Sequence, residues 1–326
     1  MKWTLTDLVV GLAAVALVAV PAGLSSACRS REAANRIKCG SNLRQVGQAM
    51  RQYAIDDVRG GSFPRAKYEP RLVPTAFTGS ESGDPFDDAV APNDVTAAMF
   101  HLLRSSDLEP DAFLCPSSAT VPIWDDELPA RGNFESREEL AYSFANPYPP
   151  AEIDDGGQWW SDRLPAGFVL AADLHPGTAA VETTGLNASA KAFSKVNSAN
   201  HAGEAQCVLF ADGSVRIVHT PYEGVANDNI WTAAERPAWG DPPHIGTMSP
   251  AIPRHADDSV LFPHGDPAEH AKALAYGTAS HRHLVTQRLG GLAVGLLSVG
   301  LLAGLVWIRR RTSTESTVAS QRGAFD

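Results

Sequence analysis

The feature that most constrains this chain is a junction near its start, where an uncharged apolar run passes directly into a basic, amphipathic segment. The apolar run covers Leu8 to Cys28, and the basic segment follows from Arg29 to Tyr53. About 20 helical residues match the roughly 30 Å hydrocarbon thickness of a bilayer. The run therefore predicts a membrane-spanning helix. A cleaved secretory signal is the alternative, because small residues suited to cleavage lie at Ala22, Ser25 and Ala27.

Beyond the apolar run, apolar residues recur at spacings of four, three, four and three, which is the pattern of an amphipathic helix. These residues are Cys39, Leu43, Val46, Met50 and Tyr53. The arginines and lysine of the same segment mostly fall off this stripe. One helix is therefore predicted to run from the membrane into a folded domain and to lay its apolar stripe on that domain.

A second predicted span is Leu289 to Ile308, twenty uncharged residues that end at three arginines, Arg309 to Arg311. Because positive residues favour the cytoplasmic side, this triplet predicts a cytoplasmic C-terminus. Basic residues after the first span point the other way, and we give the triplet more weight. The expected localisation is the inner (cytoplasmic) membrane, with both termini cytoplasmic and the main domain extracytoplasmic. Glycines four residues apart in the second span leave open a homo-oligomer through helices.

Several short segments between the two spans have the composition of strands and are separated by turn-forming residues. They are Ala141 to Ala145, Gly167 to Ala172, Ala205 to Phe210 and Val215 to Val218, and a short helix is expected at Val95 to Arg104. The sequence predicts an α+β arrangement in which an antiparallel sheet packs on the N-terminal helix. The expected parts are 1–57 (spanning and amphipathic helix), 58–240 (α+β domain), 241–286 (Pro/His-rich linker), 287–311 (second span) and 312–326 (disordered tail).

Two stretches carry a resemblance. One is Arg31-Glu-Ala-Ala-Asn-Arg-Ile-Lys-Cys-Gly-Ser-Asn-Leu-Arg-Gln-Val-Gly47, and the other is the run from His201, across ten residues, to Asp212-Gly213. Together they resemble a large bacterial family of pilin-like (pseudopilin-like) proteins, which have a prepilin-type N-terminal helix and a C-terminal His-x9/10-Asp-Gly box. Trp3-Thr-Leu-Thr-Asp-Leu8 also resembles a prepilin start.

The resemblance implies a type IV pilin-like fold and a non-enzymatic envelope protein with a protein-interaction role, in type II-like secretion or a surface structure. The implied partners are the membrane and other envelope or pilin-like proteins. The processing region departs from the family, because Lys2 precedes Trp3 where prepilin peptidases require glycine, and Asp7 replaces glutamate. Processing of the N-terminus therefore stays open.

Charge and cysteine spacing limit the other functions. The formal net charge is -10, which argues against nucleic acid as a partner because phosphate binding needs a concentrated basic face. The four cysteines, Cys28, Cys39, Cys115 and Cys207, contain no Cys-x-x-Cys pair, so the spacing predicts no structural zinc site. A disulfide between Cys39 and Cys115 is open if the domain is outside the cytoplasm. Lipidation at Cys28 is a further alternative.

Four residues could form a functional site. Asp173, His175, His201 and Asp212 could converge as ligands of a divalent metal, or His201 could act as a general base beside an aspartate. The favoured interpretation is structural, because no catalytic or cofactor-binding motif accompanies them. In it, Asp212 and Gly213 form a hairpin turn with positive φ at both positions.

No enzyme and no cofactor are therefore expected. Weak calcium binding stays open at the acidic turns Asp154 to Gly157 and Asp257 to Asp258. The alternative function is a membrane-anchored, extracytoplasmic metal-binding module or hydrolase that uses His201 and nearby aspartates.

Overall fold

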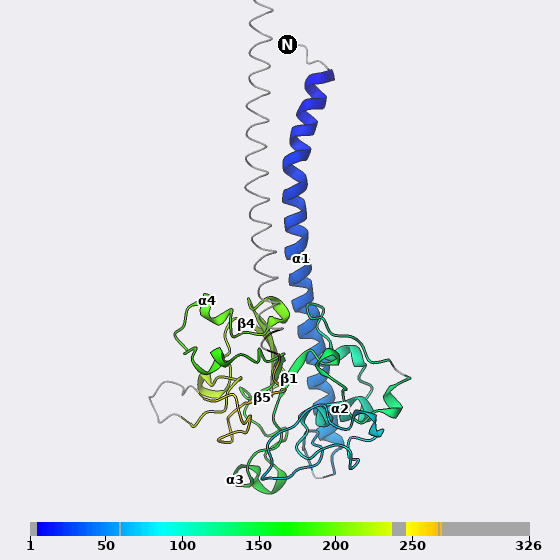
Figure 1. The fold of residues 1–326 in the computed structure, drawn as a ribbon, viewed down its shortest axis with the longest axis vertical. Helices are drawn as coiled ribbons and strands as arrows, with labels where there is room; N and C mark the ends of the chain where they lie inside the picture. The colour runs from blue at the N-terminus through cyan, green and yellow to red at the C-terminus, as the bar shows by residue number, and fades with distance from the viewer. Residues whose placement is uncertain (1–4, 59, 125, 237–245, 267, 269–326) are drawn as a thin grey trace, which may run out of the picture. The chain divides into compact units, whose positions relative to one another are not determined.

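The structure is a computed structural model that describes residues 5–58, 60–124, 126–236, 246–266 and 268, with side chains from residue 30 onward. The chain divides into two compact units, residues 1–31 with 278–326, and residues 32–277. Helix α1 spans Leu5–Asp56. All of the sheet belongs to the second unit, to which the rest of this description applies (Figure 1).

The described part of the second unit contains strands and short helices joined by loops and turns. After α1 the α-helices are α2 (Val95–Ser105), α3 (Ala151–Asp154) and α4 (Ala190–Phe193). The strands are β1 (Tyr142–Ala145), β2 (Val169–Asp173), β3 (Gln206–Phe210), β4 (Val215–Val218) and β5 (Leu261–Phe262). Single-turn 3-10 helices connect them, namely η1 (Ser80–Ser82), η2 (Pro110–Phe113), η3 (Leu128–Ala130), η4 (Arg137–Glu139), η5 (Asp155–Gly157), η6 (Ala179–Glu182), η7 (Ala199–His201) and η8 (Val225–Asn227).

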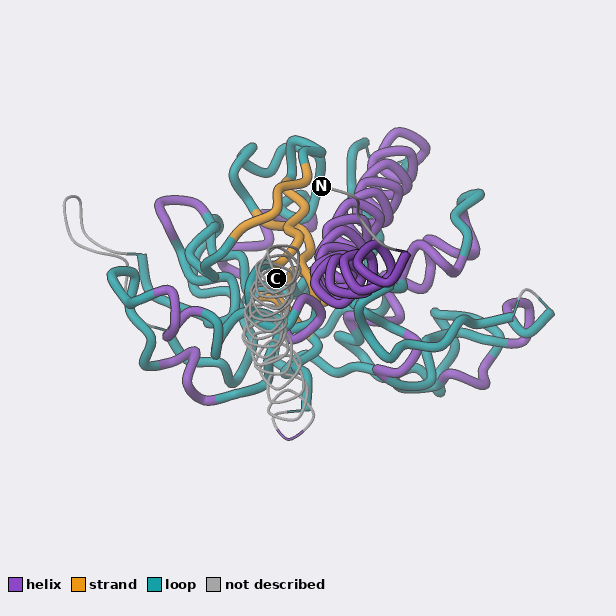
Figure 2. Tube along the Cα trace, turned by 90° about the horizontal axis from the view of Figure 1, so that it is seen from above, coloured by secondary structure: helices purple, strands orange, loops and turns teal. Residues whose placement is uncertain are grey.

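The five strands form one sheet in the order β4-β3-β2-β1-β5, and every neighbouring pair is antiparallel. The strands are drawn in orange in Figure 2. The four strands expected from the sequence are found within one or two residues of their predicted ends. Every residue of β1, β2 and β3 is buried, so both faces of the sheet centre are covered. β5 lies in the stretch 241–286 that was expected to be a linker, and it pairs with β1.

The predicted apolar stripe of α1 packs against this sheet and against α2. Cys39, Leu43, Val46 and Met50 have no exposed surface, and Tyr53 lies edge-on to His101 of α2 with ring centroids 5.3 Å apart. The helix approaches β3 closely at a glycine: a Cβ atom on Gly47 would lie only 2.8 Å from Leu209 Cδ1. The stripe thus fixes which face of α1 meets the domain.

The turn between β3 and β4 differs from the predicted one. Gly213 has a φ of +82°, but Asp212 does not have a positive φ. The Gly213 N–H donates to the Phe210 carbonyl at 2.8 Å, and the Phe210 N–H donates to the Ser214 carbonyl at 2.9 Å. One glycine in the left-handed region is enough for this longer connection, whereas a two-residue turn would need two such residues. The Asp212 carboxylate accepts from the Ser214 N–H at 2.8 Å.

The predicted fold class, a type IV pilin-like α+β fold with a spanning N-terminal helix and a C-terminal transmembrane helix, is wrong. The described chain is a five-stranded antiparallel sheet with few helices. Within the described ranges there is also no helix whose length and apolar character would let it cross a membrane. From residue 30 onward α1 buries one stripe and exposes charged residues, which is the pattern of a helix packed on a protein core.

The same finding corrects the predicted localisation, in which two spans placed the chain in the inner membrane. The membrane and periplasmic assignments depended on those spans and are corrected with them. The pseudopilin-like and type II secretion-like assignments rest on sequence motifs and stay predictions. The second predicted span, Leu289 to Ile308, lies outside the described residues, as do Lys2 and Trp3 of the processing region. Asp7 lies in α1, where only the backbone is described.

A buried cluster of cysteine, histidine and aspartate

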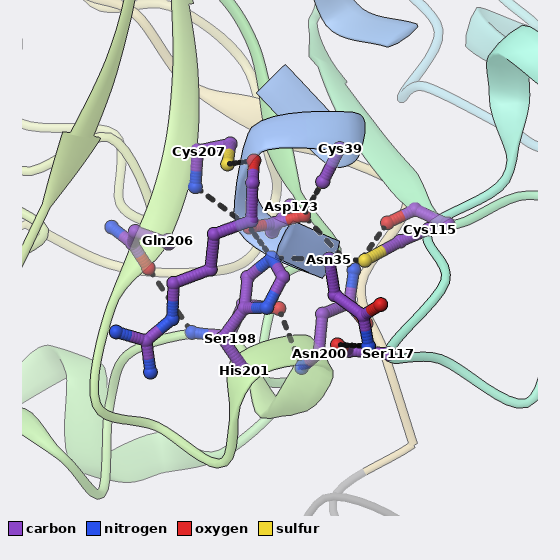
Figure 3. Close-up of polar contacts among 12 residues, drawn as sticks. Asn35, Cys39, Cys115, Ser117, Asp173, Ser198, Asn200, His201, Gln206 and Cys207 are labelled. Carbon is purple, nitrogen blue, oxygen red and sulfur yellow. Dashed lines mark hydrogen bonds and ion pairs between the residues drawn. The ribbon is translucent and has the colours of Figure 1, made fainter. Parts of the chain in front are cut away.

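Asp173, the last residue of β2, is the centre of a buried polar cluster (Figure 3). It has no exposed surface. Its Oδ2 accepts the Cys207 backbone N–H at 2.7 Å, and its Oδ1 accepts the Asn200 side-chain amide at 3.1 Å and the Cys39 thiol at 3.0 Å. A buried carboxylate without such donors would be costly. These bonds therefore explain how the sheet tolerates an acid at this position.

Two thiols reach the cluster from α1 and β3. Cys39 belongs to the buried stripe of α1, and its Sγ lies 3.3 Å from the Tyr142 hydroxyl. Cys207 is the second residue of β3, and its thiol donates to the Arg36 carbonyl of α1 at 3.5 Å. Gly40 of α1 also faces this thiol, because a Cβ atom there would lie 3.9 Å from Cys207 Sγ, an ordinary van der Waals distance. The helix and the strand therefore present their thiols to the same buried space.

His201 ends the short helix η7 and directs its imidazole into the cluster. The side chain has no exposed surface. Its Nδ1 lies 2.7 Å from Oε1 of Glu32, and its Nε2 lies 3.4 Å from Asp173 Oδ2 and 3.7 Å from Cys115 Sγ. Because a carboxylate only accepts hydrogen bonds, Glu32 fixes the proton on Nδ1. Nε2 is then the ring atom that faces the sulfurs.

The ligand-type atoms of Cys39, Asp173, His201 and Cys207 all lie within 4.8 Å of one another. All four residues are buried. They come from α1, β2, η7 and β3, so the group joins four segments that are far apart in sequence. Cys115 borders this group, and Cys39, Cys115 and Cys207 are all free thiols. The disulfide left open between Cys39 and Cys115 is therefore not formed in this structure.

The cluster favours positive charge on the His201 ring. Burial alone would lower the pKa of His201, but hydrogen bonds with Cys115, Cys207 and Glu32 and the charge of Asp173 outweigh it and raise that pKa to about 12. Burial raises the pKa of the Cys39 thiol far above its usual value. Interaction with the neighbouring Cys39 thiol and with His201 lowers the pKa of Cys115 to about 7. The carboxylate of Asp173 and the sulfur of Cys115 thus lie near Nε2 and favour the protonated, positively charged ring.

Two of the four residues predicted as metal ligands belong to this cluster and two do not. Asp173 and His201 converge as described. His175 lies elsewhere: its Nδ1 accepts the Gly177 N–H at 2.8 Å, and its Nε2 lies 3.0 Å from the Trp231 carbonyl. Both ring nitrogens of His175 therefore contact backbone groups.

Asp212 and Gly213 lie at the other end of β3 from His201. Their turn contacts Arg51 of α1, which donates to the Ala211 carbonyl at 2.6 Å, whereas His201 contacts Glu32 of the same helix. Glu32 and Arg51 are separated by roughly 28 Å of helix at 1.5 Å per residue. The two ends of the His-x10-Asp-Gly box therefore serve different contacts and do not form one site.

The acidic turns left open for calcium make protein contacts. The Asp154 carboxylate forms an ion pair with Arg65 at 2.8 Å, and Asp257 pairs with Arg236. Asp258 accepts the Arg254 N–H at 2.7 Å. Carboxylates of both turns thus have protein partners, and calcium binding at these turns stays an untested alternative.

Sequence reasoning missed the three thiols as a group, although it named Asp173 and His201. The only local signal was that Cys39 falls on the buried stripe and Cys207 inside a buried strand. It also missed Glu32, which accepts from Ser117 Oγ at 2.8 Å and contacts His201.

No family model, curated protein or solved structure matches this chain. The resemblance to the pilin-like family, the protein-interaction role, the exclusion of an enzyme and the expected partners therefore stay predictions, and the fold and the cluster are described on their own chemistry.

Proposed function

We propose that this chain is a metal-binding protein and that its buried cluster of Cys39, Cys207, His201 and Asp173 is the site of a transition-metal ion of the zinc class. The observation that carries the proposal is the convergence of these four donor groups within 4.8 Å in a buried site. Thiolate and imidazole ligands favour Zn²⁺ and similar soft ions, while Ca²⁺ and Mg²⁺ prefer all-oxygen sites.

The position of Glu32 supports this function. In metal sites a ligating histidine almost always donates its second ring N–H to a carboxylate, a backbone carbonyl or water, which orients the ring. His201 has this arrangement, because Nδ1 lies 2.7 Å from Glu32 and Nε2 faces the thiols. Glu32 is itself fixed by Ser117 and by Arg36, the latter at 3.2 Å.

The electrostatics support a cation at the same point. The cluster raises the pKa of His201 to about 12, so the surrounding groups stabilise a buried positive charge beside Asp173 and the thiols. A metal ion bound to Nε2 replaces that proton and is stabilised by the same groups. Metal binding also requires deprotonated thiols, which the ion itself favours.

The burial of the donors indicates a structural role for the ion. Catalytic zinc sites keep one coordination position open to water or substrate, whereas structural sites are closed by protein ligands. Cys39, Asp173, His201 and Cys207 are all buried. In this proposal the ion ties α1 to the sheet, so metal binding contributes directly to the stability of the domain.

Metal content and affinity of the full-length chain test the proposal. After purification and dialysis we expect about one Zn²⁺ per chain, measured by inductively coupled plasma mass spectrometry. Competition with a chromogenic chelator gives the zinc affinity. His201→Gln and Cys207→Ser should each weaken binding more than the roughly 10–100-fold typical of losing an outer-shell partner.

His219→Gln is the matched control, because His219 is exposed and its ring contacts the Glu204 carbonyl, away from the cluster. Wild-type protein that takes up no stoichiometric metal would overturn the proposal. Equal zinc affinity in wild type and His201→Gln would do so as well.

A further inference from the structure

Resting on the proposed metal function, we infer that Cys115 is the fourth ligand and that Asp173 stays outside the coordination sphere, which makes the centre a closed Cys₃His site. Cys115 is almost fully buried, with 2% of its surface exposed. Its Sγ lies 3.7 Å from His201 Nε2. With metal–sulfur and metal–nitrogen bonds of about 2.3 and 2.0 Å, two ligands of a tetrahedral site are roughly 3.5 Å apart. The observed separation is close to that value.

The ligand atoms of Cys39, His201 and Cys207 all lie within 4.8 Å of one another. Cys115 lies beside this group, with its Sγ 3.7 Å from the Nε2 atom of His201. Three sulfurs and one nitrogen form one of the common ligand sets of structural zinc.

Asp173 is less suited to bind the ion, because its oxygens are already used by the protein. Oδ2 accepts the Cys207 backbone N–H, and Oδ1 accepts the Asn200 amide. These two donors stay in place when the thiols lose their protons. Asp173 is therefore a positioning residue that fixes the start of β3 and the loop containing Asn200, and through them the thiol of Cys207.

The loop that carries Cys115 is fixed beside the site by the same elements. Asn42 of α1 donates to the Asp111 and Leu114 carbonyls at 3.1 and 2.7 Å, and the Tyr142 hydroxyl of β1 donates to the Leu114 carbonyl at 3.0 Å. Ser117, two residues after Cys115, donates to Glu32, which orients His201. The loop thus brings the fourth thiol and the group that orients the imidazole to the same place.

X-ray absorption at the zinc edge of the full-length, zinc-loaded protein tests this inference. We expect three sulfur neighbours at about 2.3 Å and one nitrogen in the wild type. Cys115→Ser should show two sulfurs and bind zinc at least tenfold more weakly. Asp173→Asn should retain three sulfurs, and Cys28→Ser is the matched control for replacing a cysteine.

The results separate this inference from the function on which it rests. Two sulfurs plus an oxygen in wild-type protein, with Asp173→Asn losing the oxygen, would overturn Cys115 as a ligand while leaving the metal function intact. Protein without bound zinc would overturn both. The wild-type sulfur count decides the question even if Cys115→Ser fails to fold.

Discussion

The Nδ1 atom of His201 lies 2.7 Å from Oε1 of Glu32, a residue 169 positions earlier in the chain. This contact joins helix α1 to the short helix η7. Burial alone would raise the pKa of Glu32, but hydrogen bonds from His201 and Ser117 outweigh it and hold that pKa below its usual value. Glu32 therefore stays ionised and keeps the His201 ring in one orientation.

Glu32→Gln tests this orientation. The amide can present a donor to Nδ1, which allows the ring proton to move to Nε2 and block metal binding. We expect zinc affinity to fall roughly 10–100-fold, as for other outer-shell carboxylates, with the ligand set unchanged by X-ray absorption. Glu204→Gln is the control, because Glu204 is mainly exposed and pairs with Arg36 without contacting the cluster. Equal loss in both variants would contradict the role of Glu32.

Removing the metal should destabilise the domain. A ligand that binds only the folded state raises the free energy of unfolding by about 4 kcal/mol when its free concentration is 1,000 times its dissociation constant. We expect a chelator to lower the midpoint of thermal unfolding of the wild type and to leave that of His201→Gln unchanged. A chelator effect of the same size in both proteins would show that the stabilising ion is bound elsewhere.

The contact between α1 and β3 gives a test based on packing. A Cβ atom at Gly47 would meet the buried Leu209 side chain at 2.8 Å, whereas at Gly40 the nearest atom, Val215 Cγ1, would be 3.5 Å away. Overpacking typically costs about 1–3 kcal/mol, and alanine is favoured over glycine in a helix by roughly 1 kcal/mol.

Urea unfolding should therefore show Gly47→Ala to be less stable than Gly40→Ala by about 1–3 kcal/mol. Gly40→Ala should match the wild type or exceed it. Equal stability of the two variants would mean that α1 does not approach β3 as described.

A buried pair of acids predicts how stability depends on pH. Burial raises the pKa of Asp228 to about 7 and, together with the charge of Asp228, raises that of Asp258 to about 8. Unfolded aspartate has a pKa of about 3.9, so between about pH 4 and pH 8 the folded protein binds more protons than the unfolded chain. The stabilisation from this pair is complete below about pH 4 and is lost as the pH rises towards 8.

Asp228→Asn removes one of the two charges. Relative to wild type, we expect the variant to gain stability at pH 8–9, on the order of 1 kcal/mol or more, and to gain less at pH 5. Urea unfolding of both proteins across this pH range measures the difference in their free energies of unfolding. Burial lowers the pKa of His264 to about 4, and its contribution is the same in both proteins and so cancels in this difference. Asp257→Asn is the control, because that carboxylate pairs with Arg236. A difference that is constant with pH would contradict the assignment.

Much of the local structure could be predicted from the sequence. The stripe from Cys39 to Tyr53 identified the buried face of α1, because a helix repeats every 3.6 residues and its apolar side has to be covered. The four strands were identified because apolar runs between turn residues pack into a sheet. β5 was missed because a strand of two residues, Leu261–Phe262, is too short to show an alternating apolar pattern.

The metal centre shows the limit of such reasoning. The spacing of the cysteines predicted no zinc site, because the usual signal is two ligands a few residues apart on one loop. Here Cys39, Cys115 and Cys207 come from a helix, a loop and a strand, and no short pattern relates them. His175 and Asp212 were grouped with His201 as candidate metal ligands, but strand β3 carries Asp212 away from His201.

The sequence by itself determined which faces of its helices and strands are apolar, and hence which side chains are buried, because local periodicity is a property of neighbouring residues. Only the tertiary structure decided that the buried thiol of Cys39 meets Cys207 and His201. That meeting depends on the order of strands and on where α1 crosses them, and both are set by packing between segments more than 100 residues apart in the chain.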